Sequence, residues 1–357
     1  MKIMLMGIAA LTAGALALVA SVVAADRAFD DNDGPQLASE HGIAASDVSG
    51  PKSFAGITGA DSTALAKAHK PYPATLPPVP DGDVVEVHMV LKDVTIEIAP
   101  GVSYAAWGFE GGAPGPIVHA RQGQKIRMTL ENGGAIPHSI DFHAARIAPN
   151  RAFVDVMPGE SFTFEFDASD PGVFMYHCGT KPVLAHIANG MYGAIVVDPV
   201  PALPKADKEY VLVAGEWYLS NDGVEQPAQL DMAKARAMTP DWTAFNGYAA
   251  QYVTHPLTAD PGDLVRFYVV DAGPSLTTAF HVVGTIFDTV YPNGDMRRDH
   301  TMKGVQTVDV PAGGGAVFEV TIDEPGFYPF VSHAFAHVDL GQVGLLQVGN
   351  PKGAGSH

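Results

Sequence analysis

Apolar residues of this chain gather in short runs that are separated by turn residues. The runs 84–91 and 94–98 are rich in valine and isoleucine, and a similar run, 209–215, opens a later series. Short β-branched segments bounded by glycine, proline and aspartate are typical of β-strands. Many such strands at regular spacing predict an all-β chain made of Greek-key sandwiches or barrels.

Two breaks in this pattern divide the chain. Residues 26–80 are rich in Ala, Ser, Asp and Pro with little periodicity, so we expect a flexible leader there. The proline-rich stretch 198–204 indicates a linker. We therefore expect a first domain over 81–199, a second over 205–350 and a short tail, 351–357, and the chain length suits two domains.

The two halves also repeat each other, which predicts that one fold is used twice. The matched segments are 154–160 with 308–313, 171–174 with 325–328, and 193–197 with 344–348. In this alignment the paired residues are His177 with His333, Cys178 with Ala334, and Met191 with Gln342. The second half lacks the cysteine but keeps a histidine, so we expect it to contribute that histidine to a shared site.

The composition narrows the class of partner. The chain has a net charge of −18, and its 38 glycines and 28 prolines favour turns and short strands. Such an acidic protein is not expected to bind nucleic acid, because phosphate backbones attract basic surfaces. An acidic surface suits a basic protein partner, such as a basic electron donor.

Residues 1–25 have the character of an export signal. They contain one lysine and then a long apolar run that ends in Val23, Ala24 and Ala25. Small residues at this point are typical of a cleavage site, so we expect export to the periplasm or another extracytoplasmic space. The alternative is an uncleaved membrane anchor, because the run is about long enough to span a bilayer.

Cys178 is the only cysteine of the chain, and other metal-binding residues surround it in the sequence. His186 follows it by eight residues and Met191 by thirteen, and His138 lies upstream. A thiolate, two imidazoles and a weakly bound thioether select copper in an electron-transfer centre. The alternative for a lone cysteine is a buried, inert thiol; the flanking ligands favour copper.

A second ligand group follows from the alternation of side chains along a strand. His177 and Cys178 are consecutive and should point to opposite faces, whereas Asp141 and His143 are two residues apart and should share a face. His143 and His177 thus begin a second group, and His333 is the candidate third ligand. Three imidazoles with an open position make a catalytic metal centre that can bind water or a small oxyanion.

Five segments resemble, in the same order, motifs of the copper-containing nitrite reductases. They are IPHSIDFH at 136–143, YHC at 176–178, HIANGMYG at 186–193, FHVVGTIFD at 280–288 and VSH at 331–333. The resemblance implies two tandem cupredoxin domains, a homotrimer and two coppers per chain. The implied ligands are His138, Cys178, His186 and Met191 for type 1 copper, and His143, His177 and, across a subunit interface, His333 of the partner subunit for type 2 copper.

The reaction that this resemblance implies is the reduction of nitrite to nitric oxide with one electron and two protons. A cytochrome c or a small blue copper protein would give its electron to type 1 copper, from which it would pass through Cys178 and His177 to type 2 copper. Asp141 and His281 would flank the open copper position and deliver protons. The implied supporting residues are Gln306 and Thr307, which would hydrogen-bond His281, and Val283, which would narrow the pocket.

Two features depart from the family pattern. The segment 146–151 replaces a stretch of small residues that we expect after the first histidine motif, and His337 is an additional histidine beyond His333. Neither feature removes a predicted metal ligand. Both concern the access to the site and the identity of the substrate.

Other functions remain open at this point. A laccase-type oxidase is excluded, because its copper cluster needs His-x-His motifs and the chain has none. A cupredoxin electron carrier would need one copper and would not need Asp141, His281 and His333 together. A two-copper oxidoreductase with another small substrate fits the same ligands, because a fold does not fix a substrate. Asp141 as a turn residue and His281 as a core residue are the alternatives for those two positions.

Overall fold

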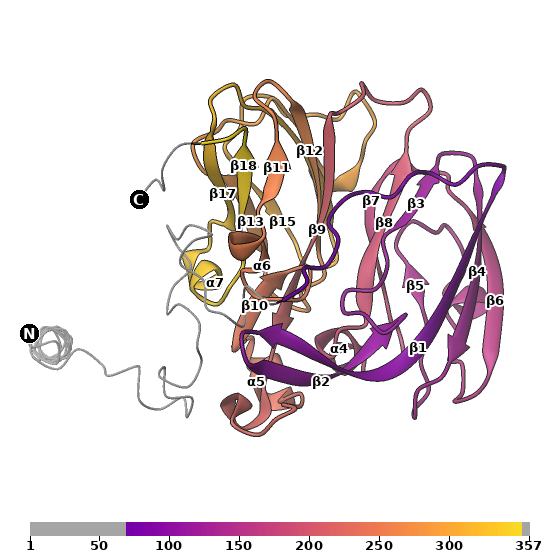
Figure 1. The fold of residues 1–357 in the computed structure, drawn as a ribbon. Coiled ribbons are helices and arrows are strands. Elements are labelled where there is room, and N and C mark those ends of the chain that lie inside the picture. Colours follow the sequence, from indigo (N-terminus) through magenta and orange to yellow (C-terminus); the bar gives the residue numbers. More distant parts are fainter. Residues whose placement is uncertain (1–68, 352–357) are drawn as a thin grey trace, which may run out of the picture. The chain divides into compact units, whose positions relative to one another are not determined.

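A computed structural model describes residues 69–351 of the chain (Figure 1). The export or anchor segment expected over 1–25, the leader up to residue 68 and the tail from residue 352 lie outside the described residues. Within residues 69–351, no helix is both long and apolar enough to cross a membrane.

The first domain is a sandwich of two four-stranded sheets. One sheet has the order β2 (Val102–Phe109), β1 (Val84–Ala99), β4 (Lys125–Asn132) and β6 (Ser161–Asp167). The other has the order β3 (Val118–Arg121), β8 (Tyr192–Asp198), β7 (Gly172–His177) and β5 (Asp141–Phe142). Every second residue of β4 is buried, because one face of the strand lines the core between the sheets.

The second domain is a sandwich of two five-stranded sheets. One has the order β10 (Trp242–Phe245), β9 (Lys208–Trp217), β12 (Leu264–Asp271), β16 (Gly315–Thr321) and β14 (Thr289–Tyr291). The other has the order β11 (Leu257–Ala259), β18 (Val343–Val348), β17 (Gly326–Ser332), β13 (Thr278–Val282) and β15 (Thr307–Val310). The all-β fold with two similar domains, which the sequence predicts, is confirmed.

Short helices lie in the connections between strands. They are α3 (Pro149–Ala152), α4 (Val183–Ala188), α5 (Met232–Ala237), α6 (Gln251–Thr254), α7 (Phe335–Asp339) and the 3-10 turns η2 (Ser220–Gly223) and η3 (Pro292–Gly294). Two of them occupy equivalent places, because α4 connects β7 to β8 in the first domain and α7 connects β17 to β18 in the second.

Strand β7 lies at the boundary between the two domains, where it packs on β12 and β16 of the second domain. Val173 and Met175 of β7 are buried in one apolar cluster with Tyr268 and Val317 of those strands. Packing from both domains fixes β7, and so it also fixes the last residue of the strand, His177.

Strand pairing corrects the alignment of the two halves. His177 pairs with Tyr192 in the first domain, and Val331 pairs with Val343 in the second. The equivalents of His177 and Cys178 are therefore Val331 and Ser332, and the predicted matches to His333 and Ala334 were wrong by two residues. An alignment of His177 with His333 would need two extra residues in β17, but this strand is continuous from Gly326 to Ser332. The other match, Met191 with Gln342, is confirmed by the same pairing.

Residues 69–80 lie against both domains, which differs from the flexible leader that we expect over 26–80. The backbone N–H of Val211 donates to Ala74 O at 2.7 Å, and that of Leu76 donates to Glu209 O at 3.2 Å. On the first domain, Gln124 Nε2 donates to Pro80 O at 2.9 Å. A low-periodicity, proline-rich segment is thus ordered by partners far away in the sequence.

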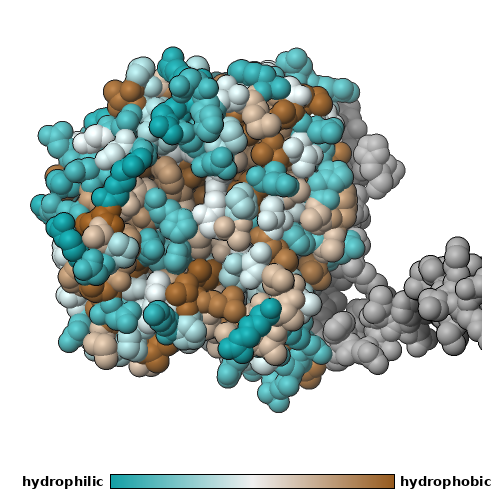
Figure 2. Space-filling view, turned by 180° about the vertical axis from the view of Figure 1, so that it is seen from behind, coloured by the Kyte–Doolittle hydropathy of each residue, from teal (hydrophilic) through white to brown (hydrophobic). Residues whose placement is uncertain are grey.

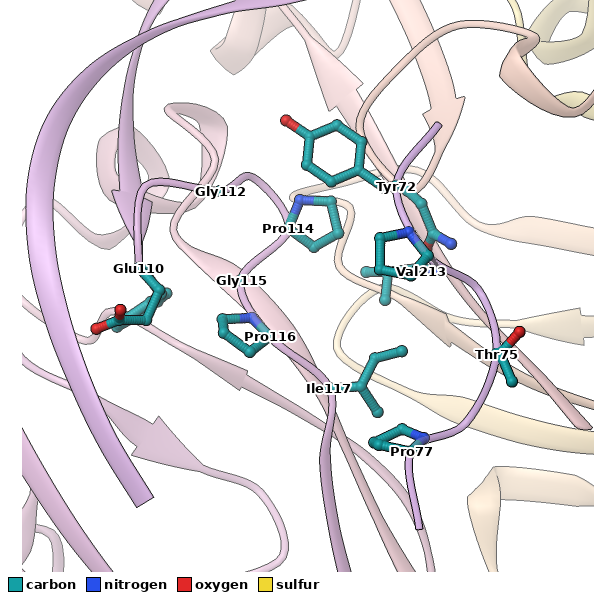
Figure 3. A pocket seen from close by; sticks show the side chains of 13 residues that line it. Tyr72, Thr75, Pro77, Glu110, Gly112, Pro114, Gly115, Pro116, Ile117 and Val213 are labelled. Atoms are coloured by element: carbon teal, nitrogen blue, oxygen red, sulfur yellow. Dashed lines mark hydrogen bonds between the residues drawn. The ribbon is translucent and has the colours of Figure 1, made fainter. Parts of the chain in front are cut away.

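A cavity of about 430 Å³ is lined by this segment and by both domains (Figure 3). Its lining is mostly apolar and includes Tyr72 and Pro77 on one side and Pro114, Pro116 and Ile117 on the other. The side chains that Figure 3 shows include few polar groups, and none of the candidate metal ligands lines this cavity.

The face that Figure 2 shows is a mixture of polar residues and smaller apolar patches. Among the exposed large hydrophobic residues, Ile136 and Met157 flank the loop that carries His138, and Phe335 contacts the ring of His333. Exposed apolar side chains therefore occur next to candidate site residues in both domains.

Candidate metal centres

The first group of candidate ligands is fully buried. Cys178 Sγ lies 3.2 Å from His186 Nδ1 and 3.9 Å from His138 Nδ1, and the two histidine nitrogens lie 3.1 Å apart. The ring of Trp107 packs against both imidazoles, with its centroid 4.9 Å from that of His186. Three ligand atoms that converge in a dry site can hold one metal ion.

Each ligand of the first group comes from a different connection of the sandwich. Cys178 directly follows β7, and His186 lies in the last turn of α4. Met191 directly precedes β8, is completely buried, and accepts the Cys178 N–H at its backbone oxygen at 3.1 Å. The His138 loop is held by Asn132 Nδ2, which donates to Ile136 O at 2.8 Å. The structure thus places all four predicted type 1 residues in one region.

The protonation states of the ligands in the first group favour metal binding. Burial, and to a smaller extent the neighbouring His186, lower the pKa of His138 to about 4, so the imidazole is neutral at pH 7. Burial also raises the pKa of the Cys178 thiol, while hydrogen bonds from Ser139 and Thr180 act in the opposite direction. The Ser139 N–H donates to the sulfur at 3.4 Å. A metal that binds here displaces the thiol proton.

The second group consists of Asp141, His143 and His177, whose ligand atoms also converge. His177 Nε2 lies 3.1 Å from His143 Nε2. Each ring uses its other nitrogen to donate to a carbonyl, since His143 Nδ1 lies 3.0 Å from Gly313 O and His177 Nδ1 lies 2.9 Å from Cys178 O. Both Nε2 atoms therefore carry a lone pair, which is the usual arrangement of histidines that bind metals.

The remaining two candidate histidines form a pair in the second domain. The ring centroids of His281 and His333 lie 5.4 Å apart. His281 Nδ1 donates to the backbone oxygen of Gln306 at 2.6 Å, and Thr307 pairs with His281 between β13 and β15. Within the part of the chain that the structure describes, His333 does not join the group of Asp141.

A cavity of about 270 Å³ lies beside His143. Its charged lining residues form two ion pairs: Arg146 Nη2 lies 2.8 Å from Asp170 Oδ1, and Arg297 Nε lies 2.8 Å from Asp295 Oδ1. Arg146 begins the segment that departs from the family pattern. The departure thus places a charged, paired side chain next to a candidate ligand.

Three supporting groups are not evident from the sequence: the Ser139 N–H, the Gly313 carbonyl and the ring of Trp107. Backbone donors and acceptors carry no residue-specific signal, so no pattern of side chains could have revealed the first two. Trp107 lies in β2, far from every ligand motif in sequence, and only the sandwich brings its ring to His186.

Comparison with known proteins shows which family has this architecture. Residues 91–202 and 223–352 match two domain families that are both described as multicopper oxidase. The copper-containing nitrite reductase of Neisseria gonorrhoeae is 39% identical over 282 residues, which are 76% of this chain and 71% of the relative. This chain belongs to the copper-containing nitrite reductase family.

Solved structures of copper nitrite reductases have the same fold. The enzyme of Nitrosomonas europaea is 34% identical with a TM-score of 0.69, and the match covers 76% of this chain and 96% of that chain. The enzyme of Thermus scotoductus is 30% identical with a TM-score of 0.67, and the match covers 74% and 62% of the two chains. The fold is thus that of a two-domain cupredoxin.

The residues present fit the coppers of this family. One thiol, two imidazoles and a buried thioether gather at the first centre, and this soft donor set suits type 1 copper. Two imidazoles with free Nε2 atoms and a carboxylate gather at the second, which suits type 2 copper but leaves it one imidazole short of three.

Proposed function

We propose that this chain reduces nitrite to nitric oxide and water with one electron and two protons. One observation carries the proposal: the consecutive residues Cys178 and His177 belong to different metal groups. Cys178 Sγ lies 3.2 Å from His186 Nδ1, while His177 Nε2 lies 3.1 Å from His143 Nε2. Copper bound at the two groups supplies the one-electron chemistry, and the chain joins them through a few covalent bonds.

The type 2 centre is shared between subunits in this proposal. His143 and His177 of one chain would bind copper together with His333 of the partner subunit. The support is that His333 is exposed and lies beside His281, outside the group of Asp141. An exposed ligand on one domain and an incomplete ligand group on the other suit a head-to-tail ring, so we propose a homotrimer.

Asp141 and His281 are the proton donors in this proposal. Asp141 pairs with His177 between β5 and β7, so its carboxylate lies beside both imidazoles of the second group. The His281 ring lies beside that of His333, so His281 of the partner subunit would reach the same site. The Gln306 carbonyl accepts from His281 Nδ1 and leaves Nε2 to hold or release a proton. Two acids account for the two protons that turn one oxygen of nitrite into water.

The electron would come from a basic protein, such as a cytochrome c or a small blue copper protein. The net charge of −18 attracts a basic partner. Ile136 and Met157 are exposed next to the His138 loop, and an apolar patch beside a buried centre suits brief docking of a donor. We further propose that the chain acts outside the cytoplasm, exported by residues 1–25, with anchoring by the same segment as the alternative.

The proposal is tested by nitric oxide release from nitrite. An electrode would follow anaerobic, copper-loaded protein with an artificial electron donor. Turnover that disappears in His333→Ala, while the type 1 colour remains, is the expected result. Parent protein that holds two coppers per chain and releases no nitric oxide would overturn nitrite as the substrate and favour electron transfer or another small substrate.

A further inference from the structure

The second domain contains a cluster of four polar side chains that neither copper centre uses. Thr278, Ser332 and Gln342 are at most 3% exposed, and His337 is half-buried. His337 Nδ1 lies 3.2 Å from Gln342 Oε1 and 3.4 Å from Ser332 Oγ. Gln342 Nε2 donates to Thr278 Oγ1 at 2.9 Å. The cluster is therefore a continuous hydrogen-bonded network in the interior.

This network occupies the place of the type 1 centre in the duplicated fold. Strand pairing makes Ser332 the equivalent of Cys178. The N–H of Gln342 donates to His337 O, as the N–H of Met191 donates to His186 O in the first domain. Thr278 is equivalent to His138, since the Ala279 N–H donates to Ser332 Oγ as the Ser139 N–H donates to Cys178 Sγ.

Two of the four ligand positions thus kept a residue able to bind a metal, His337 and Gln342, and two became hydroxyl residues. Hydroxyls replace the thiol and one imidazole, so the soft donor set of type 1 copper is gone. Each buried polar group instead finds a hydrogen-bond partner in the network. A fully satisfied buried network specifies one arrangement of the strands that it joins.

The strands joined by this network are those that carry the two functional histidines of the second domain. Ser332 directly precedes His333, and the His333 N–H donates to Ala279 O at 2.6 Å. Thr278 and Ala279 lie in β13, three and two residues before His281. The network therefore fixes β13 and β17 at the point where His281 and His333 leave the sandwich.

We propose that His337 and Gln342 are positioning residues for His333 and His281 and so set the geometry of the type 2 centre. A hydrogen-bonded network holds these strands where a metal holds the equivalent strands of the first domain. The inference rests on the proposed function for the role of type 2 copper, but it concerns the geometry of the site and not the identity of the substrate.

The test compares His337→Leu, which removes the network donor, with His337→Asn, whose amide nitrogen can replace Nδ1. The copper-loaded full chain would be studied without nitrite by electron paramagnetic resonance and by metal titration. We expect His337→Leu to change the type 2 hyperfine coupling and to weaken type 2 copper binding by about tenfold. The type 1 absorption should stay unchanged, and His337→Asn should restore the type 2 signal. His88→Leu, at an exposed position of the first domain, is the matched control.

A type 2 signal and affinity equal to those of the parent in His337→Leu would overturn the proposal, as would equal changes in His337→Leu and His337→Asn. If His337→Leu does not fold, Gln342→Met and Gln342→Glu form the second pair. Glutamate keeps the acceptor for His337 and can accept from the Thr278 hydroxyl in place of the lost amide donor, whereas methionine can do neither. Only Gln342→Met should therefore change the signal. None of these measurements uses turnover, so a failure of the nitrite assay would not change what this test shows about the type 2 geometry.

Discussion

Ser332 lies at the position in the second domain that Cys178 occupies in the first. Ser332 Oγ is 3.4 Å from His337 Nδ1, and Cys178 Sγ is 3.2 Å from His186 Nδ1. The two domains therefore preserve one arrangement of a strand end, a following helix and a histidine, although only the first has a thiol.

The preserved arrangement predicts that the lost copper centre can be rebuilt. Thr278→His together with Ser332→Cys would join His337 and Gln342 to complete a set of thiolate, two imidazoles and a weak axial oxygen. We expect additional visible absorption and one more copper per chain, measured by spectroscopy and metal analysis. Each single substitution serves as a control and should add no colour. A folded double variant without new absorption would contradict the equivalence of the two positions.

Asp141→Asn should keep both coppers and lose most of the turnover. Asparagine preserves the shape of the side chain but cannot give up a proton, and loss of a general acid costs about 10²–10⁴-fold in rate. The rate of nitric oxide release and the copper content per chain are the two measurements. Asp167→Asn, at an exposed position of β6, is the matched control and should keep parental activity. Parental turnover in Asp141→Asn would remove Asp141 from the mechanism.

A shared type 2 centre predicts complementation between inactive chains. His143→Ala and His333→Ala chains would each be inactive alone. In mixed trimers, about a quarter of the sites would take His143 from a chain in which it is intact and His333 from a neighbouring chain in which it is intact. Activity should therefore return to about that fraction on co-expression. A mixture of His143→Ala and His177→Ala chains is the control, because both ligands come from the same subunit and no site can then contain both. No recovery in the first mixture would contradict sharing.

The stability of the second domain should decrease as the pH rises through neutrality. Burial raises the pKa of Asp271 to about 7, although the Gly273 and Thr278 N–H groups donate to its carboxylate. The folded state thus binds this proton more tightly than the unfolded state, so the stabilisation is complete below the unfolded pKa and is lost as the pH passes the folded one. We expect the free energy of unfolding to fall by about 2–3 kcal/mol between pH 5 and pH 8 from this group.

Urea unfolding of the parent and of Asp271→Asn at several pH values measures that contribution, since other groups affect both proteins alike. The difference between the two curves should change with pH by the stated amount. Asp260→Asn, at an exposed position of the same domain, controls for the loss of one negative charge. A constant difference between parent and Asp271→Asn would show that the carboxyl titrates equally in both states.

The two ligand groups could be predicted from the sequence because strand alternation is a local property. His177 and Cys178 must point to opposite faces of a strand, and this rule assigns them to different groups without knowledge of the fold. In the structure, the ligand atoms of His138, Cys178 and His186 converge, and so do those of Asp141, His143 and His177. The all-β, two-domain fold follows from similarly local signals.

Features that depend on distant partners could not be predicted in this way. The alignment of the halves was wrong in β17 because residue identity was followed there, whereas the pairing of Val331 with Val343 fixes the register. Residues 69–80 lack periodicity, and their order comes from Gln124 and β9, which lie far along the chain. The assignment of His333 to another subunit depends on assembly, which a single chain does not contain.

The succession of His177 and Cys178 at the end of β7 has a consequence for how such a protein can evolve. The two residues share one peptide bond, and β7 is clamped by both domains. A substitution that shifts this strand to tune one copper must disturb the other, so the two centres are inherited and selected as a single unit. In the second domain no thiol precedes the exposed histidine, so a change in its network can act on the type 2 centre without disturbing the type 1 centre.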